Sequence, residues 1–137
     1  MKVEIRYFTR GGNTKKLADA IAKELGVEAK TTAEPLTEDV DLLFLGSSVY
    51  ANGVDEEVKK FVRGIGVKVG KAVNFSTAAL IKSTHKQVAK LLAEKKIPFA
   101  EEEFACRGSF SLLHRGKPDE KDCRAAAEFA KKIVSRE

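Results

Sequence analysis

The sequence predicts an α/β fold: a three-layer sandwich around a five-stranded parallel sheet of strand order 2-1-3-4-5. Short apolar runs typical of strands alternate with amphipathic helical patterns along the chain. The run Asp41–Gly46 (DLLFLG) is almost entirely apolar, as expected for a central parallel strand buried on both faces. At 137 residues the chain is long enough for one core, so we expect a single domain spanning residues 1–137.

The first half of the chain is predicted to contain three strands and two helices. Leu17 and Ile21 fall on one helical face, and Gly26 ends that helix. Residues 33–39 are polar and include Pro35, which indicates a loop. The predicted strands are Val3–Phe8, Val27–Thr31 and Asp41–Gly46, and the predicted helices are Thr14–Leu25 and Asp55–Gly64.

The second half continues the alternation. Ser83 or Thr84 can cap the third helix. Within the last strand we expect only Phe104–Cys106 to be deeply buried, and the run Glu101–Glu103 to protect an edge from pairing with other chains. The predicted strands are Lys71–Ala78 and Phe99–Cys106, and the predicted helices run from residue 84 to about Lys95 and over Asp119–Arg136.

The predicted strand order places the first and third strands side by side, with connections leaving in opposite directions. Ligands of open α/β sheets bind at the carboxyl ends of the strands at such a switch point. The loops expected there are Thr9–Thr14 and Ser47–Gly53.

The first of these loops has the composition of an anion site. It reads Thr9-Arg10-Gly11-Gly12-Asn13-Thr14 and leads directly into a helix. The glycines let the backbone approach a ligand closely, and the helix N-terminus favours negative charge. Thr9, Asn13 and Thr14 add side-chain donors, so the loop is predicted to hold a phosphate.

The second loop, Gly46–Gly53, offers hydroxyls, an amide and the Tyr50 ring. That ring can cover a flat heteroaromatic system, while Asn52 and Gly53 permit unusual backbone angles. The alternative is an ordinary turn with Tyr50 half-buried. Ser76 and Thr77 reach the same edge, where they either line a pocket or turn the chain.

These two loops resemble those of the flavodoxins, which bind FMN. T-x-x-G-N-T at Thr9–Thr14 is similar to the family's phosphate loop, and G-S-S-x-Y-x-N-G at Gly46–Gly53 to its loop beside the flavin ring. Two features depart from the family: Gly11 stands where Ser or Thr is usual, and no stacking aromatic follows the fourth strand. The cofactor-binding residues that the resemblance implies are Thr9, Arg10, Gly11, Gly12, Asn13, Thr14, Ser48, Val49, Tyr50, Asn52, Gly53, Ser76 and Thr77.

The resemblance implies an FMN-binding electron-transfer protein that works between a reductase and an acceptor. One alternative is a small FMN-dependent reductase or oxidase acting with a quinone, NAD(P)H or protoporphyrinogen. The loops also resemble those of bacterial flavodoxin-type protoporphyrinogen oxidases, whose second half carries a long inserted loop that has no room here. Another alternative is a flavin-free binding module of the same fold.

Charge and composition argue against nucleic-acid binding, membrane insertion and metal binding. The net charge is +5, but lysines lie beside glutamates, as at Lys23 and Glu24, so we expect no nucleic-acid partner. No apolar run approaches the length of a membrane helix and no signal peptide is evident, which favours a cytoplasmic protein without a membrane partner. We expect it to be a monomer or a weak dimer. Cys106 and Cys123 lack metal or redox spacing, and His85 and His114 are not paired as metal ligands.

Overall fold

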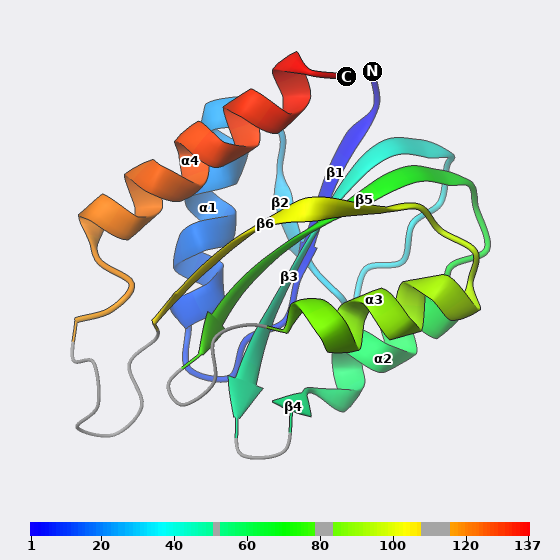
Figure 1. Ribbon diagram of the computed structural model, residues 1–137, viewed down its shortest axis with the longest axis horizontal. Helices are drawn as coiled ribbons and strands as arrows, with labels where there is room; N and C mark the ends of the chain where they lie inside the picture. The colour runs from blue at the N-terminus through cyan, green and yellow to red at the C-terminus, as the bar shows by residue number, and fades with distance from the viewer. Residues whose placement is uncertain (51–52, 79–83, 108–115) are drawn as a thin grey trace.

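The structure is a computed structural model that describes residues 1–50, 53–78, 84–107 and 116–137, without the side chains of residues 49, 50, 53 and 107 (Figure 1). Strands and helices alternate along most of the chain. The strands are β1 (Val3–Tyr7), β2 (Ala29–Thr31), β3 (Val40–Tyr50), β4 (Gly53–Val54), β5 (Val69–Ala78) and β6 (Phe99–Arg107). The helices are α1 (Asn13–Leu25), α2 (Glu56–Arg63), α3 (His85–Glu94) and α4 (Glu120–Ser135).

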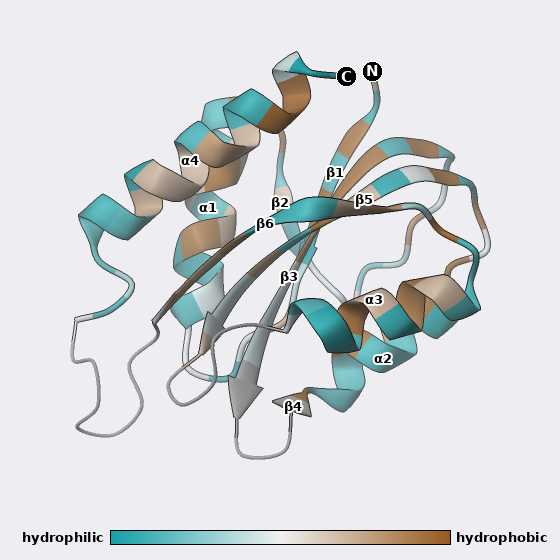
Figure 2. Cartoon of the chain, viewed as in Figure 1, coloured by the Kyte–Doolittle hydropathy of each residue, from teal (hydrophilic) through white to brown (hydrophobic). Residues whose placement is uncertain are grey.

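The parallel sheet has the order β2-β1-β3-β5-β6, which confirms the predicted order 2-1-3-4-5. Helices α1 and α4 cover one face, and α2 and α3 cover the other (Figure 1). Apolar residues recur along the central strands and on parts of each helix, as Figure 2 shows. The fold is therefore the three-layer sandwich expected from the alternation of strands and helices.

Each face of the sheet has its own apolar core. On the α1 and α4 face, Leu17 and Ile21 pack in one cluster with Phe44 and Phe75, all with no exposed surface. The core on the α2 and α3 face contains the predicted inward residues of those helices: Val58, Phe61, Val62, Val88, Leu91 and Leu92. The helical periodicity therefore identified the correct faces.

The helix ends follow local capping chemistry. Asp119 and Asp122 form a reciprocal capping box at the start of α4, and the Asp55 side chain caps α2. Gly26 closes α1 in the left-handed conformation, with φ of 67°. Thr84 precedes α3, but its side chain makes no capping hydrogen bond.

Strand β3 is longer than predicted. It continues from Val40 to Tyr50 because β5 runs beside it as far as the pair Val49 and Ala78, so the backbone beyond Gly46 stays in the ladder. The expected loop Ser47–Gly53 was therefore wrong for its first four residues. The end of β3 forms a short antiparallel pair with β4, a strand that the sequence did not predict.

The edge strands also differ from prediction. Strand β2 contains only Ala29–Thr31, and the expected deep burial of Phe104–Cys106 was wrong. Phe104 and Cys106 are half-buried and Ala105 is exposed, whereas Ala100 near the other end of β6 is buried. In the described sheet β6 lies at an edge beside β5, as the Glu101–Glu103 run suggested. A strand at an edge lacks the cover that central strands receive from both sides.

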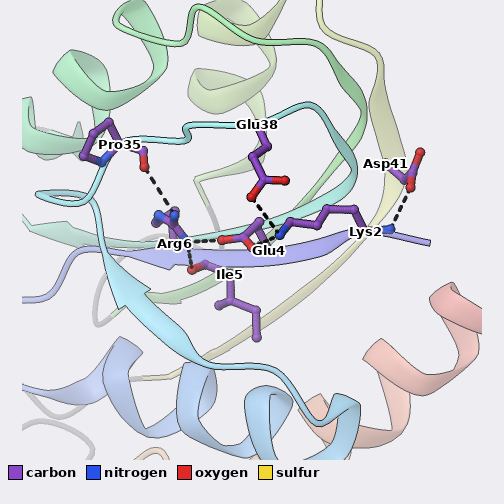
Figure 3. A network of polar contacts seen from close by, with 7 residues as sticks. All are labelled: Lys2, Glu4, Ile5, Arg6, Pro35, Glu38 and Asp41. Carbon is purple, nitrogen blue, oxygen red and sulfur yellow. Dashed lines mark hydrogen bonds and ion pairs between the residues drawn. The ribbon is translucent and has the colours of Figure 1, made fainter.

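The connection from β2 to β3 passes over β1 without a helix, and a buried arginine fastens it (Figure 3). Arg6 is 3% exposed and pairs with Glu4 at 2.7 Å. Its guanidinium also donates to the carbonyls of Glu34 at 2.8 Å and Pro35 at 3.4 Å. The charge is thus hydrogen-bonded on several sides, as burial requires.

Gly46 on β3 is closely packed against the side chains of Phe75 and Thr14. A Cβ atom built there would lie 2.4 Å from the Phe75 ring and 3.0 Å from the Thr14 methyl group. Both neighbours are buried. Glycine at this position therefore lets α1 approach the sheet.

We expect Gly46→Ala to lower the free energy of unfolding by about 1–3 kcal/mol, because the added methyl overpacks a filled core. Gly66→Ala is the matched control: Gly66 is exposed, and a Cβ there would meet nothing within 4 Å. Urea unfolding followed by circular dichroism measures both. Equal stability of the two variants would contradict the close packing at Gly46.

Candidate functional site

The loop between β1 and α1 presents the helix N-terminus at the carboxyl edge of the sheet. Gly12 precedes α1 with φ of 88°, a left-handed conformation that favours glycine. The Thr9 hydroxyl accepts a hydrogen bond from the Gly12 N–H at 3.0 Å and shapes the turn. As the N-cap residue, Gly12 provides no side-chain capping hydrogen bond, and the first turn of α1 contains no acidic residue. This is the arrangement that suits an anionic ligand.

Thr14 lies behind this loop instead of at its mouth. It has no exposed surface, and its hydroxyl lies 3.2 Å from the carbonyl of Ser47 and 3.0 Å from the hydroxyl of Thr77. It also contacts the Ser48 hydroxyl. Thr14, Ser48 and Thr77, called the hydroxyl cluster below, thus join α1 to β3 and β5. The structure gives Thr14 a supporting position, where the sequence suggested a direct phosphate donor.

A second polar cluster occupies the opposite face of the same strands. The Ser47 hydroxyl donates to the Thr84 hydroxyl at 2.8 Å, and the Asn74 amide donates to the same oxygen at 3.0 Å. These contacts explain why the Thr84 side chain does not cap α3. Ser76 is also fully buried, and its hydroxyl has no partner among the described residues. Polar groups therefore fill both sides of the sheet near its carboxyl edge.

Arg10 ties the loop to the start of α2. Its guanidinium lies 2.7 Å from the Asp55 carboxylate. Partial burial raises the pKa of Asp55, but the N–H of Glu57 and the charge of Arg10 outweigh it, so this pKa lies below its usual value. The charge at Asp55 therefore favours the folded state.

The structure brings together most of the predicted cofactor residues that it describes. Thr9–Thr14 lie at the start of α1, and Ser48 and Thr77 meet Thr14 beneath them. Ser76 lies beside Ser47 in the ladder, with its side chain buried. The backbone of Val49 and Tyr50 pairs with β4, where Gly53 lies, but the side chains of these residues, and Asn52 entirely, lie outside the described residues.

The remaining reactive groups show no second site. Burial, and then the Asp122 carboxylate, raise the pKa of the Cys106 thiol to about 12, and Cys123 contacts the Lys16 carbonyl. His85 lies in the first turn of α3 and stacks on Phe99. Within the described ranges, no group of three His, Cys, Asp or Glu residues could hold a metal ion, and no helix is long and apolar enough to cross a bilayer.

Comparison with solved structures defines the class of fold. A flavodoxin from the domain Archaea aligns with a TM-score of 0.81 and 16% identity, over 99% of this chain and 98% of that chain. Flavodoxin 2 from Bacillus cereus aligns with a TM-score of 0.75 and 18% identity over the full length of both chains. Rubredoxin oxygen:oxidoreductase from Desulfovibrio gigas has a similar module: the TM-score is 0.75 at 16% identity, over 98% of this chain and 35% of that one.

Sequence comparison assigns the family. A family model described as a flavodoxin domain matches residues 4–108. The chain therefore belongs to the flavodoxin domain family. It is also 32% identical over 136 residues to the uncharacterized protein MJ0298 of Methanocaldococcus jannaschii, covering 89% of this chain and 90% of that protein.

We expect Ser48→Ala to lower the free energy of unfolding by about 1–3 kcal/mol, because it strips a partner from two buried hydroxyls. Ser135→Ala is the control, since Ser135 is exposed and its hydroxyl donates to the Lys132 carbonyl one turn earlier on α4. Equilibrium urea titration compares the two. A loss no greater than that of the control would show that the hydroxyl cluster adds nothing to stability.

The Asp55 charge predicts a specific pH dependence. Because folding lowers the pKa of Asp55, its contribution is complete above about pH 4 and is lost as the pH falls through the folded pKa. Asp55→Asn retains a capping oxygen but removes the charge. Native protein should therefore exceed this variant in stability near neutral pH, and the difference should shrink in acid.

Chemical unfolding across the acid range measures this difference. The double variant Arg10→Gln/Asp55→Asn should show the same pH dependence as Asp55→Asn, because the Arg10 guanidinium lowers the pKa of this carboxylate. A stability difference that stays constant as the pH falls would contradict the assignment.

Proposed function

We propose that the chain binds FMN non-covalently and carries electrons between a reductase and an acceptor protein, as a monomer or weak dimer. The phosphate would lie at the first turn of α1, and the ring along the ends of β3 and β5. When bound, the isoalloxazine ring would take up and release one or two electrons. The residues of the chain would bind and orient it.

The single observation that carries this proposal is the first turn of α1. Gly12 leaves the helix without a side-chain cap, and the turn holds Lys15 and Lys16 with no acidic residue. Positive charge at a helix N-terminus is unfavourable by itself. A bound phosphate would remove this unfavourable interaction, because it would accept hydrogen bonds from the backbone N–H groups and neutralise the nearby lysines.

The local backbone leaves space for such a group. A Cβ atom at Gly11 or at Gly12 would meet nothing within 4 Å, so the turn is open on its outer side. Lys15 pairs with Asp19 at 2.7 Å, whereas Lys16 is exposed and has no carboxylate partner in the described part of the chain. Lys16 would add positive potential at the phosphate.

We expect Gly11→Ser to tighten FMN binding by about tenfold, because it adds a hydroxyl donor beside the phosphate without a clash. Gly11→Asp should weaken binding by about tenfold or more through like-charge repulsion, and Gly11→Asn is its uncharged control. Quenching of FMN fluorescence on titration gives each Kd.

Riboflavin, which lacks the phosphate, separates the phosphate site from the ring site. Its affinity should be the same for all the Gly11 variants. If the chain binds no FMN, the proposal fails; if the Asp and Asn variants bind FMN equally, the phosphate lies elsewhere. Steady turnover of the FMN-loaded protein with NAD(P)H and a quinone, without a separate reductase, would indicate an enzyme instead of a carrier.

A further inference from the structure

Charge is distributed unevenly over the folded chain. Residues 56–97, which begin at the start of α2, hold ten of the 25 basic residues and three of the 20 acidic ones, a net charge of +7. The remaining residues therefore carry −2. Most of this segment forms α2, β5 and α3, and these two helices cover one face of the sheet (Figure 1). On this face basic residues therefore outnumber acidic ones, although α2 also contains Glu56 and Glu57.

A groove of about 330 Å³ runs between α2 and α3. The buried side chains of Val54 and Leu91 contribute apolar surface to it. Its charged lining consists of Lys59 and Arg63 from α2 and of Lys90 and Glu94 from α3. The groove therefore has an apolar floor, with three cations and one carboxylate around it.

The cations of α2 and α3, both those that line the groove and those outside its lining, differ in their ion pairs. Lys59 pairs with Glu56 at 3.0 Å, and Lys60 lies 3.9 Å from Glu57. In contrast, Arg63, Lys86 and Lys90 are exposed and have no carboxylate partner within the described ranges. Lys86 and Lys90 also stand four residues apart on α3, a spacing at which like charges repel. Folding does not explain this placement.

The groove is continuous with the edge of the proposed flavin site. Gln87 on α3 lines the groove, and its side chain accepts a hydrogen bond from the N–H of Val54 at 2.7 Å. Val54 belongs to β4, which pairs with Val49 and Tyr50 at the end of β3. A molecule in the groove would therefore lie beside the strand ends where the ring is proposed.

We propose that the groove between α2 and α3 is a docking surface for an acidic redox protein, whose carboxylates pair with Arg63 and Lys90 in the groove and with Lys86, one turn earlier on α3. The redox character of this partner rests on the proposed function, whereas its acidity rests on the charge of the surface alone. The apolar floor and the Glu94 carboxylate favour a folded protein over a nucleic acid, since phosphates gain nothing from either.

The test uses a purified acidic plant-type ferredoxin as the probe, titrated into the 15N-labelled, FMN-loaded chain. We expect chemical-shift changes at the amides of Arg63, Gln87 and Lys90, and binding that weakens with salt. The variant Arg63→Gln/Lys86→Gln/Lys90→Gln should bind about tenfold more weakly at low ionic strength.

The control variant lowers the net charge by the same amount on the opposite side of the sheet. It is Lys121→Gln/Arg124→Gln/Lys131→Gln, three exposed positions on α4, and it should bind within about twofold of the native chain. Equal weakening of both variants would overturn the proposal, because only net charge would then matter. Tighter binding of a short DNA duplex or of phosphatidylserine vesicles to the same amides would also overturn it.

The outcome for FMN is read separately. If the chain takes up no FMN, the proposed function fails, and the same titration is run on the flavin-free chain. Docking of the ferredoxin that depends on Arg63, Lys86 and Lys90 would then still support the surface. If the chain binds FMN but the ferredoxin does not dock, the proposed function stands and the proposed docking surface is overturned.

Discussion

The hydroxyl cluster is the interaction on which the geometry of the carboxyl edge depends. Thr14 belongs to the first turn of α1, whereas Ser48 and Thr77 belong to the two central strands. Their hydrogen bonds fix where the positive end of the helix lies relative to the sheet. Since a helix dipole acts over about one turn, its position decides where an anion can be held. Gly46 lets this contact form by leaving room for the Phe75 ring.

The candidate site therefore has two layers. The outer layer is backbone: the turn at Gly11 and Gly12 and the uncapped N–H groups of α1. The inner layer is a set of buried side chains that bond one another and hold that turn in place. Residues that resemble ligand donors in a motif can thus belong to the supporting layer, as Thr14 does. Binding sites commonly need such supporting residues to hold the ligand-contacting groups in the correct geometry.

The sequence predicted the strand order correctly, for physical reasons. Apolar runs such as Asp41–Gly46 identify central strands, and strand order then identifies the switch point. The prediction was wrong where strand pairing in the folded sheet overrides the local preference of the residues. Ser47 and Ser48 are polar residues typical of a loop, yet β5 keeps them in a strand and other hydroxyls satisfy them. The sequence did not predict the burial of Arg6 either, because two of its partners, besides Glu4, are backbone carbonyls from a distant loop.

The connection between β2 and β3 lacks a helix, and this affects how the protein fluctuates. Polar contacts of Arg6 hold this connection, and β2 contributes only Ala29–Thr31 to the sheet. A region with few apolar contacts opens at lower free energy than the core. Amide hydrogen exchange in β2 should therefore outpace exchange in β3, which has β1 and β5 on its two sides. The chain can loosen at this margin while α1 and the central strands keep their positions.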